Sequence, residues 1–138
     1  MTKPILLIED DPEWGDLICH SLRQRGFRVD WFVRAHIARR RIQLTDAEGR
    51  LLNHLYPETY SIALINGRLR GSMVKGWELV PILRDCRLKV IATSGHDRDN
   101  ELMMQAGASE VIPFFELWEK IITDQFHLFE LPAARSQT

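Results

Sequence analysis

The stretch that decides the fold is ILLIEDD at residues 5–11, in which four apolar residues run directly into three acids. A short apolar run of this kind predicts a strand that is buried on both faces, as in a parallel sheet. A second such run, residues 62–65, ends in Asn66. Because parallel strands bring their carboxyl ends to one edge of a sheet, we expect Glu9, Asp10 and Asn66 to share a crevice there.

Strand and helix patterns alternate along the rest of the chain. Asp11 followed by Pro12 is typical of a helix start, and Gly26 is placed to end that helix. We expect further strands at residues 28–33, 61–65, 89–93 and 111–113, and further helices near 77–84, 97–106 and 117–129. The pattern predicts an α/β protein with a five-stranded, doubly wound parallel sheet and helices on both faces.

The segment between the second and third strands is longer than one crossover needs. Its first part is interpreted as a basic helix with Ala35, Ala38 and Ile42 facing inward. Thr45 and Glu48 have the spacing of a capping box, which predicts an extra short helix from Thr45 to Leu55. That helix is either a recognition element or a lid over exposed sheet.

Composition indicates one globular domain, which we place at residues 1–131, with a mobile tail at 132–138. Lys and Arg number 18 against 19 Asp and Glu, so no net charge draws the chain to nucleic acid or to an anionic membrane. The arginines at 34, 39, 40 and 41 are interpreted as a solvated helix face. Cys19 and Cys86 are expected to be buried free thiols, as in a cytoplasmic protein.

Four stretches together carry a family resemblance: ILLIEDDPEW, SIALINGRLRGSMVKGWEL, VIATSGHD and QAGASEVIPF. In this order and spacing they resemble the receiver domain of bacterial two-component response regulators, over nearly the whole chain. The resemblance implies a flavodoxin-like fold with strand order 2-1-3-4-5. It also implies an acidic pair, a phosphoacceptor Asp, a Ser or Thr, a Lys and an aromatic switch residue.

The chain keeps some of these residues and departs from others. Glu9 and Asp10 match the acidic pair, and Ser94 matches the hydroxyl. Asn66 stands at the phosphoacceptor position, Phe114 at the Lys and Val111 at the aromatic switch. The resemblance therefore points to a degenerate receiver, a pseudo-receiver that has lost both its nucleophile and the opposing cation.

These departures limit the chemistry of the pocket. An amide cannot form an acyl phosphate by the route that a carboxylate uses. Glu9 and Asp10 remain as a weak Mg²⁺ site, which we expect to be vacant, or as a solvated acidic cluster. Arg68 and Arg70 are expected to pair with these acids. No other cofactor is indicated. The Asn66-Gly67 pair is prone to deamidation, which would slowly produce a carboxylate.

The C-terminal part is rich in large apolar residues, and one helix cannot bury all of them. Phe115, Trp118 and Ile122 are therefore expected to form a partner surface. The partner is expected to be another signalling protein, unidentified, or a second copy in a homodimer. The spacing of the glycines and histidines indicates neither a phosphate loop nor a metal site.

The sequence thus predicts a non-enzymatic, cytoplasmic, single-domain signalling protein that acts through phosphorylation-independent protein–protein interaction. The alternative is a residually active receiver that binds Mg²⁺ or an anion, or that is phosphorylated in the old acidic pocket. A small enzyme or nucleotide binder on the same fold is a third reading, for which the chain offers no glycine fingerprint.

Overall fold

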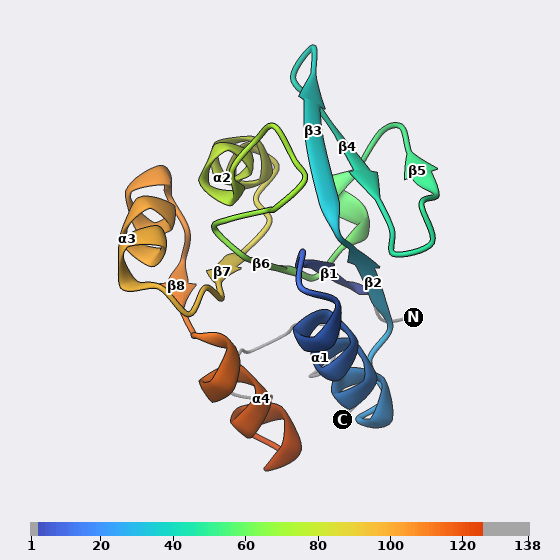
Figure 1. Cartoon of the computed structure of the whole chain (residues 1–138), viewed down its shortest axis with the longest axis vertical. Coiled ribbons are helices and arrows are strands. Elements are labelled where there is room, and N and C mark those ends of the chain that lie inside the picture. The colour runs from blue at the N-terminus through green and yellow to red at the C-terminus, as the bar shows by residue number, and fades with distance from the viewer. Residues whose placement is uncertain (1–2, 126–138) are drawn as a thin grey trace.

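The computed structural model describes residues 3–125. Its centre is a fully parallel sheet with the order β2-β1-β6-β7-β8 (Figure 1). The strands are β1 (Ile5–Ile8), β2 (Val29–Phe32), β6 (Ile62–Ile65), β7 (Val90–Ala92) and β8 (Glu110–Val111). Every residue of β1, β6 and β7 is buried, as the unbroken apolar runs predict. The five-stranded parallel sheet is confirmed, and its order matches the expected 2-1-3-4-5 pattern.

Helices cover both faces of this sheet. Helices α1 (Pro12–Gln24) and α4 (Phe114–Ile122) pack side by side on one face, and α2 (Gly76–Asp85) and α3 (Asp97–Ala106) on the other (Figure 1). The alternation of strand side chains divides the core accordingly, since Leu7 faces the α1–α4 layer and Leu6 the α2–α3 layer. The carboxyl ends of the strands are left open between the two layers.

The connection from β2 to β6 is where the sequence-based prediction was wrong. In place of a basic helix and an extra helix at Thr45–Leu55, the chain forms a three-stranded antiparallel sheet. It consists of β3 (Arg34–Ala38), β4 (Arg41–Thr45) and β5 (Leu51–Leu52), and a 3₁₀ turn, η1 (Pro57–Thr59), follows. This small sheet lies over the same face as α2 and α3, because its inner residues join their core cluster.

The error has a clear physical source. Ala35, Ala38 and Ile42 fit a helical spacing, but Ile42 and Leu44 also alternate with polar residues, as in a strand, and both are buried. The two-residue turn between β3 and β4 consists of Arg39 and Arg40, with φ angles of 53° and 64°. Two-residue turns of this kind usually contain Asn-Gly or Asp-Gly, and this turn contains neither.

Smaller differences concern the helix ends and one cysteine. Helix α4 begins at Phe114, directly after Pro113, instead of at Leu117. Pro81 lies at the sixth residue of α2, inside the helix. Cys19 is buried as expected, whereas Cys86 is exposed at the end of α2. The expected tail at 132–138, and residues 126–131 of the expected domain, lie outside the described residues.

Within residues 3–125, every helix is too short or too polar to cross a lipid bilayer.

Candidate functional site

The candidate site is a cavity of about 450 Å³ at the carboxyl ends of β1, β6 and β7. The structure brings four of the predicted pocket residues to its wall: Asp10 after β1, Asn66 after β6, Ser94 after β7 and Phe114 at the start of α4. Glu9 lies behind the wall and is fully buried. Asp11, Trp14, Arg68, Arg70 and Asp99 also line the cavity.

The side-chain amide of Asn66 connects the two acids. Its Nδ2 donates to Glu9 Oε2 at 3.2 Å and to Asp10 Oδ1 at 3.0 Å. Its Oδ1 accepts from the backbone N–H of Arg68 at 3.4 Å. A carboxylate at this position would have no proton to give to either acid, so the arrangement depends on an amide.

A guanidinium supplies the positive charge beside these acids. Arg70 Nε lies 2.7 Å from Asp10 Oδ2, and the Arg70 backbone N–H donates to the same oxygen at 3.2 Å. Burial raises the pKa of Asp10, but the hydrogen bonds from Arg70, Glu9 and the backbone together outweigh burial and hold that pKa below its ordinary value. Asp10 is therefore an ionised carboxylate that already has its counter-charge, and the expected pairing of Arg70 with this acidic cluster is confirmed.

Glu9 is in the opposite electrostatic state. Its side chain is fully buried, and burial raises its pKa to about 8, although the backbone N–H of Asp11 donates to Oε2 at 2.9 Å and lowers it in part. Its Oε1 has no hydrogen-bond partner in the described part of the chain. At neutral pH this carboxyl group is therefore mostly protonated, and a single negative charge remains between Glu9 and Asp10.

This donor set does not fit a divalent cation well. Mg²⁺ favours anionic oxygens in a near-octahedral arrangement and gives up its water reluctantly. Here Glu9 is neutral, Asp10 is paired with Arg70, and Asn66 presents its N–H₂ group to both. Among residues 3–125, no group of three or more His, Cys, Asp or Glu side chains is placed to hold a metal ion.

Ser94 is fixed by its neighbours. The Asn100 side chain accepts from the Ser94 backbone N–H at 3.2 Å and donates to the Ser94 carbonyl at 2.8 Å. The Ser94 hydroxyl oxygen accepts from the backbone N–H of His96 at 3.1 Å. The hydroxyl thus satisfies a local backbone group, as a serine at a strand end commonly does.

An aromatic pair closes the corner that a receiver's lysine would occupy. The rings of Phe114 and Trp14 stack with their centroids 5.5 Å apart and their planes 14° apart. Phe114, which the sequence places at the position of the lysine, makes this corner of the cavity apolar. Sequence reasoning did not place Trp14 on the pocket wall, where the structure has it.

Sequence reasoning also missed two polar residues of α3. Asp99 is buried and binds the Arg68 guanidinium at 3.0 Å, so Arg68 pairs with Asp99 and not with the Glu9–Asp10 pair as expected. Asn100 holds Ser94 in place. Both residues look like ordinary polar residues in the first turn of a helix, and no sequence signal marks them as buried.

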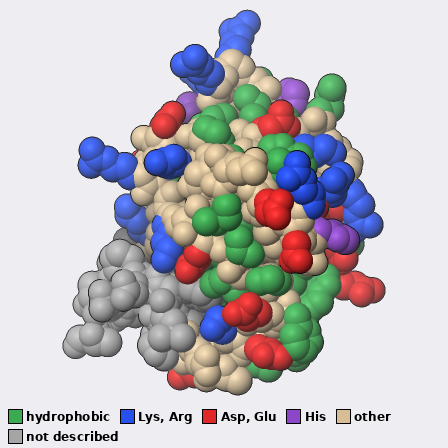
Figure 2. All heavy atoms as spheres, turned by 90° about the vertical axis from the view of Figure 1, so that its left-hand side faces the viewer, with side chains coloured by type: hydrophobic (Ala, Val, Ile, Leu, Met, Phe, Trp, Pro, Cys, Tyr) green, Lys and Arg blue, Asp and Glu red, His purple; other side chains and the backbone are tan. Residues whose placement is uncertain are grey.

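The remaining predicted residues lie outside the cavity. Val111 is in β8, opposite Ala92, at the edge of the sheet. Along α4, Phe115 and Ile122 are 59% and 41% exposed, and Trp118 lies between them with its ring 5.9 Å from that of Phe115. Hydrophobic side chains are visible in the lower half of the α3–α4 side of the molecule (Figure 2). Phe115 and Ile122 are thus exposed, whereas Trp118 between them is half-buried and packs against the core of the α1–α4 layer.

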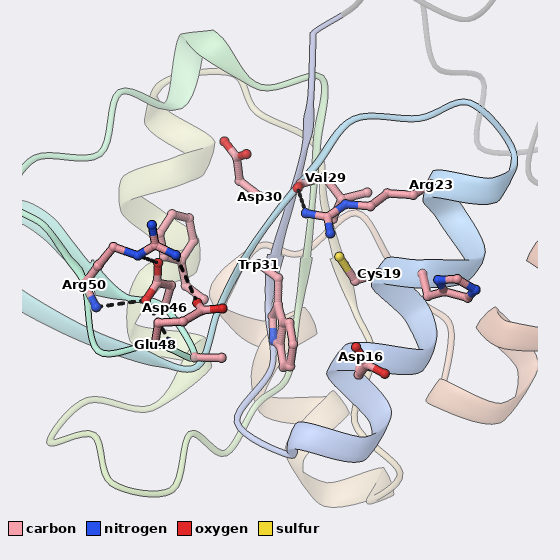
Figure 3. A pocket seen from close by; sticks show the side chains of 12 residues that line it. Asp16, Cys19, Arg23, Val29, Asp30, Trp31, Asp46, Glu48 and Arg50 are labelled. Carbon is pink, nitrogen blue, oxygen red and sulfur yellow. Dashed lines mark hydrogen bonds and ion pairs between the residues drawn. The ribbon is translucent and has the colours of Figure 1, made fainter.

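A second cavity, of about 400 Å³, lies between α1, the edge strand β2 and the turn after β4. Two of its arginines bind partners within the protein, as Figure 3 shows. Arg50 binds Asp46 and Glu48, and Arg23 donates to the Val29 carbonyl at 2.9 Å. Trp31 stands in its wall and donates from its indole N–H to the Glu9 carbonyl at 3.0 Å.

Comparison with known proteins finds similarity at the level of structure. No protein-family model matches the sequence. No curated protein matches it either. By contrast, the structure resembles the receiver domain of NtrX from Brucella abortus, with a TM-score of 0.63 and 18% identity over 91% of this chain and 98% of that domain. The chain spans 29% of the longer NtrX structure.

Two further solved structures give the same result. A CheY-like response regulator receiver domain protein from Methanospirillum hungatei has a TM-score of 0.58 and 23% identity, over 90% of this chain and 94% of that one. The non-phosphorylated HemR receiver domain from Leptospira biflexa has a TM-score of 0.56 and 21% identity, over 88% and 95%. The chain therefore has the fold of a response regulator receiver domain.

Proposed function

We propose that the protein is a response-regulator-like signalling module that works without aspartyl phosphorylation and without catalytic activity of its own. The observation that carries this proposal is the Asn66 amide, which donates to both Glu9 and Asp10. In a working receiver the same place holds a nucleophilic carboxylate that is served by a metal ion. In this chain the neutral Asn66 amide takes the place of the carboxylate, and the Arg70 guanidinium supplies the positive charge.

The stripe of Phe115, Trp118 and Ile122 is proposed as the surface that another protein contacts. Exposed apolar residues of this kind, adjacent on one helix, commonly mark a protein interface. The proposed setting is the cytoplasm, and the partner is a second signalling protein or another copy of this chain. Because hydrogen bonds from Asn66 and Arg70 hold the acidic side chains of the pocket, we propose that the shape of the pocket is constant. We also propose that partner binding does not depend on phosphorylation.

Intact mass spectrometry tests the absence of phosphorylation. The native chain is incubated with Mg²⁺ and acetyl phosphate, in parallel with a variant that carries Asn66→Asp and Phe114→Lys, which restores the missing groups. We expect no phosphoryl adduct on the native chain. A stoichiometric, base-labile adduct on the native chain would favour the alternative of a residually active receiver.

Capture of partners from the native cytosol tests the proposed surface. We expect Phe115→Glu to lose a partner that the native chain retains. Met73→Glu is the matched control, because Met73 is 89% exposed and lies on the loop before α2, away from α4. If both variants capture the same proteins as the native chain, the stripe is not the interface.

A further inference from the structure

The hairpin of β3 and β4 is the most strongly basic feature of the molecule. Residues 31–45 contain four arginines and one histidine and no acidic residue. The hairpin reaches the top of the molecule in Figure 1, and Lys or Arg side chains stand out at that same end in Figure 2. The basic residues, which sequence reasoning placed on a helix, therefore sit on a projecting two-stranded ribbon.

The two faces of this ribbon differ sharply. Ala35, Ile42 and Leu44 are buried on the inner face, which anchors the ribbon to the α2–α3 side of the core. On the outer face the cross-strand partners are Arg34 with Thr45, His36 with Gln43, and Ala38 with Arg41. None of these pairs contains an acid, so the positive charge of the outer face is not neutralised across the strands.

The arginines of the ribbon are also unpaired, unlike most other arginines of the chain. Arg34, Arg39, Arg40 and Arg41 are all exposed, and none makes an ion pair or side-chain hydrogen bond with any residue of the described range 3–125. Arg50, Arg68, Arg70 and Arg98, by contrast, each bind a carboxylate. Four guanidinium groups without a partner among residues 3–125 therefore lie on one ribbon.

We propose that this ribbon binds the phosphate backbone of duplex DNA, with the Arg39–Arg40 tip entering the major groove. A two-stranded antiparallel ribbon fits that groove, which is about 12 Å wide. Strands of five residues are roughly 17 Å long, enough to carry guanidinium groups across the groove to its phosphates. The guanidinium group of arginine can donate two parallel hydrogen bonds to one phosphate group.

Other anionic partners fit the ribbon less well. No large apolar side chain is exposed among residues 34–41 that could enter a bilayer. Arg34 and His36 lie on the outer face of β3, behind the tip, where a flat membrane would not reach them. The sequence predicted no nucleic-acid partner because these arginines were placed on a helix and because the net charge of the chain is near zero. The structure instead gathers them on one ribbon, so the local positive charge is high although the net charge is not.

Fluorescence anisotropy with a labelled duplex of roughly 20 base pairs tests the proposal, using the full chain over about 50 to 200 mM salt. The decisive variant combines Arg39→Asn and Arg40→Gly, which removes two charges while giving the turn its preferred residues. We expect this variant to bind at least tenfold more weakly and its logarithmic salt slope to fall by about two.

Arg84→Gln with Arg98→Gln is the control, because it removes the same charge from α2 and α3, and we expect it to keep the native salt slope. The proposal is overturned by the absence of DNA binding at the lowest salt, or by equal binding of the variant with Arg39→Asn and Arg40→Gly. It is also overturned if polyglutamate, or vesicles of phosphatidylserine and phosphatidylcholine, bind the ribbon more tightly than DNA does.

Discussion

At the scale of single residues, the side-chain amide of Asn66 determines how the pocket is hydrogen-bonded. A carboxylate there would accept hydrogen bonds and add charge, whereas the amide donates to Glu9 and Asp10. The neighbouring groups are consistent with this, since Arg70 neutralises Asp10 and the buried Glu9 keeps its proton. The pocket balances its charge internally.

Glu9 makes stability depend on pH. Its pKa is raised from 4.5 to about 8 in the folded protein, so between those values the folded chain holds a proton that the unfolded chain releases. The contribution of Glu9 to stability is therefore complete at and below pH 4.5 and falls as pH rises toward 8, by at most about 1.4 kcal/mol per pH unit. We expect Glu9→Gln, which cannot ionise, to flatten this decline.

Thermal unfolding of both proteins from pH 5 to pH 8.5 measures the effect. The variant and the native chain should be similar at pH 5, and the variant should be the more stable at pH 8. Parallel curves over this range would show that Glu9 does not titrate as its burial implies.

At the scale of elements, a glycine at the start of α2 sets the position of Asn66. A Cβ built on Gly76 would lie 2.1 Å from the Asn66 carbonyl oxygen, and the Gly76 N–H donates to the Gly67 carbonyl at 2.7 Å. We expect Gly76→Ala to cost about 2–4 kcal/mol in the free energy of unfolding, because the obstacle is backbone that cannot rotate away.

Gly95 is the matched control for this substitution. It lies in the same pocket wall, but nothing is within 4 Å of its built Cβ. We expect Gly95→Ala to change stability by less than about 0.5 kcal/mol in urea unfolding. An equal effect of the two substitutions would show that the close approach of α2 to β6 is not important.

The β3–β4 turn offers a prediction of opposite sign. Arg39 and Arg40 both have positive φ angles, which cost energy for residues other than glycine and asparagine. We expect Arg39→Asn with Arg40→Gly to raise the free energy of unfolding by roughly 0.5–1 kcal/mol in urea. A loss of stability would indicate that the arginine side chains stabilise the turn by contacts of their own.

The elements also show how far sequence reasoning reached. Strands β1 and β6 were predicted because their unbroken apolar runs leave no other good interpretation, and the residues that follow them were placed in one crevice correctly. The hairpin was missed because Arg39-Arg40 carries no turn signal. Asp99 was missed because its burial depends on the packing of α3 against the loop after β6, which local sequence does not encode.

At the scale of the whole molecule, a receiver fold presents three separate surfaces. The pocket at the strand ends is neutralised, the stripe on α4 is apolar, and the ribbon of β3 and β4 is basic. The ribbon takes the place of the usual crossover helix, so it adds a surface without disturbing the parallel sheet. We propose that the protein uses these surfaces for binding alone.

The most direct test of this account follows the Asn66 side-chain amide by nuclear magnetic resonance. Its N–H₂ signals are assigned from their absence in an Asn66→Asp variant, and then observed as Mg²⁺ and acetyl phosphate are added. We predict that both signals stay in place, because the amide remains bound to Glu9 and Asp10. Movement of these signals on addition of Mg²⁺ would mean that the cation enters the pocket, and would contradict the account.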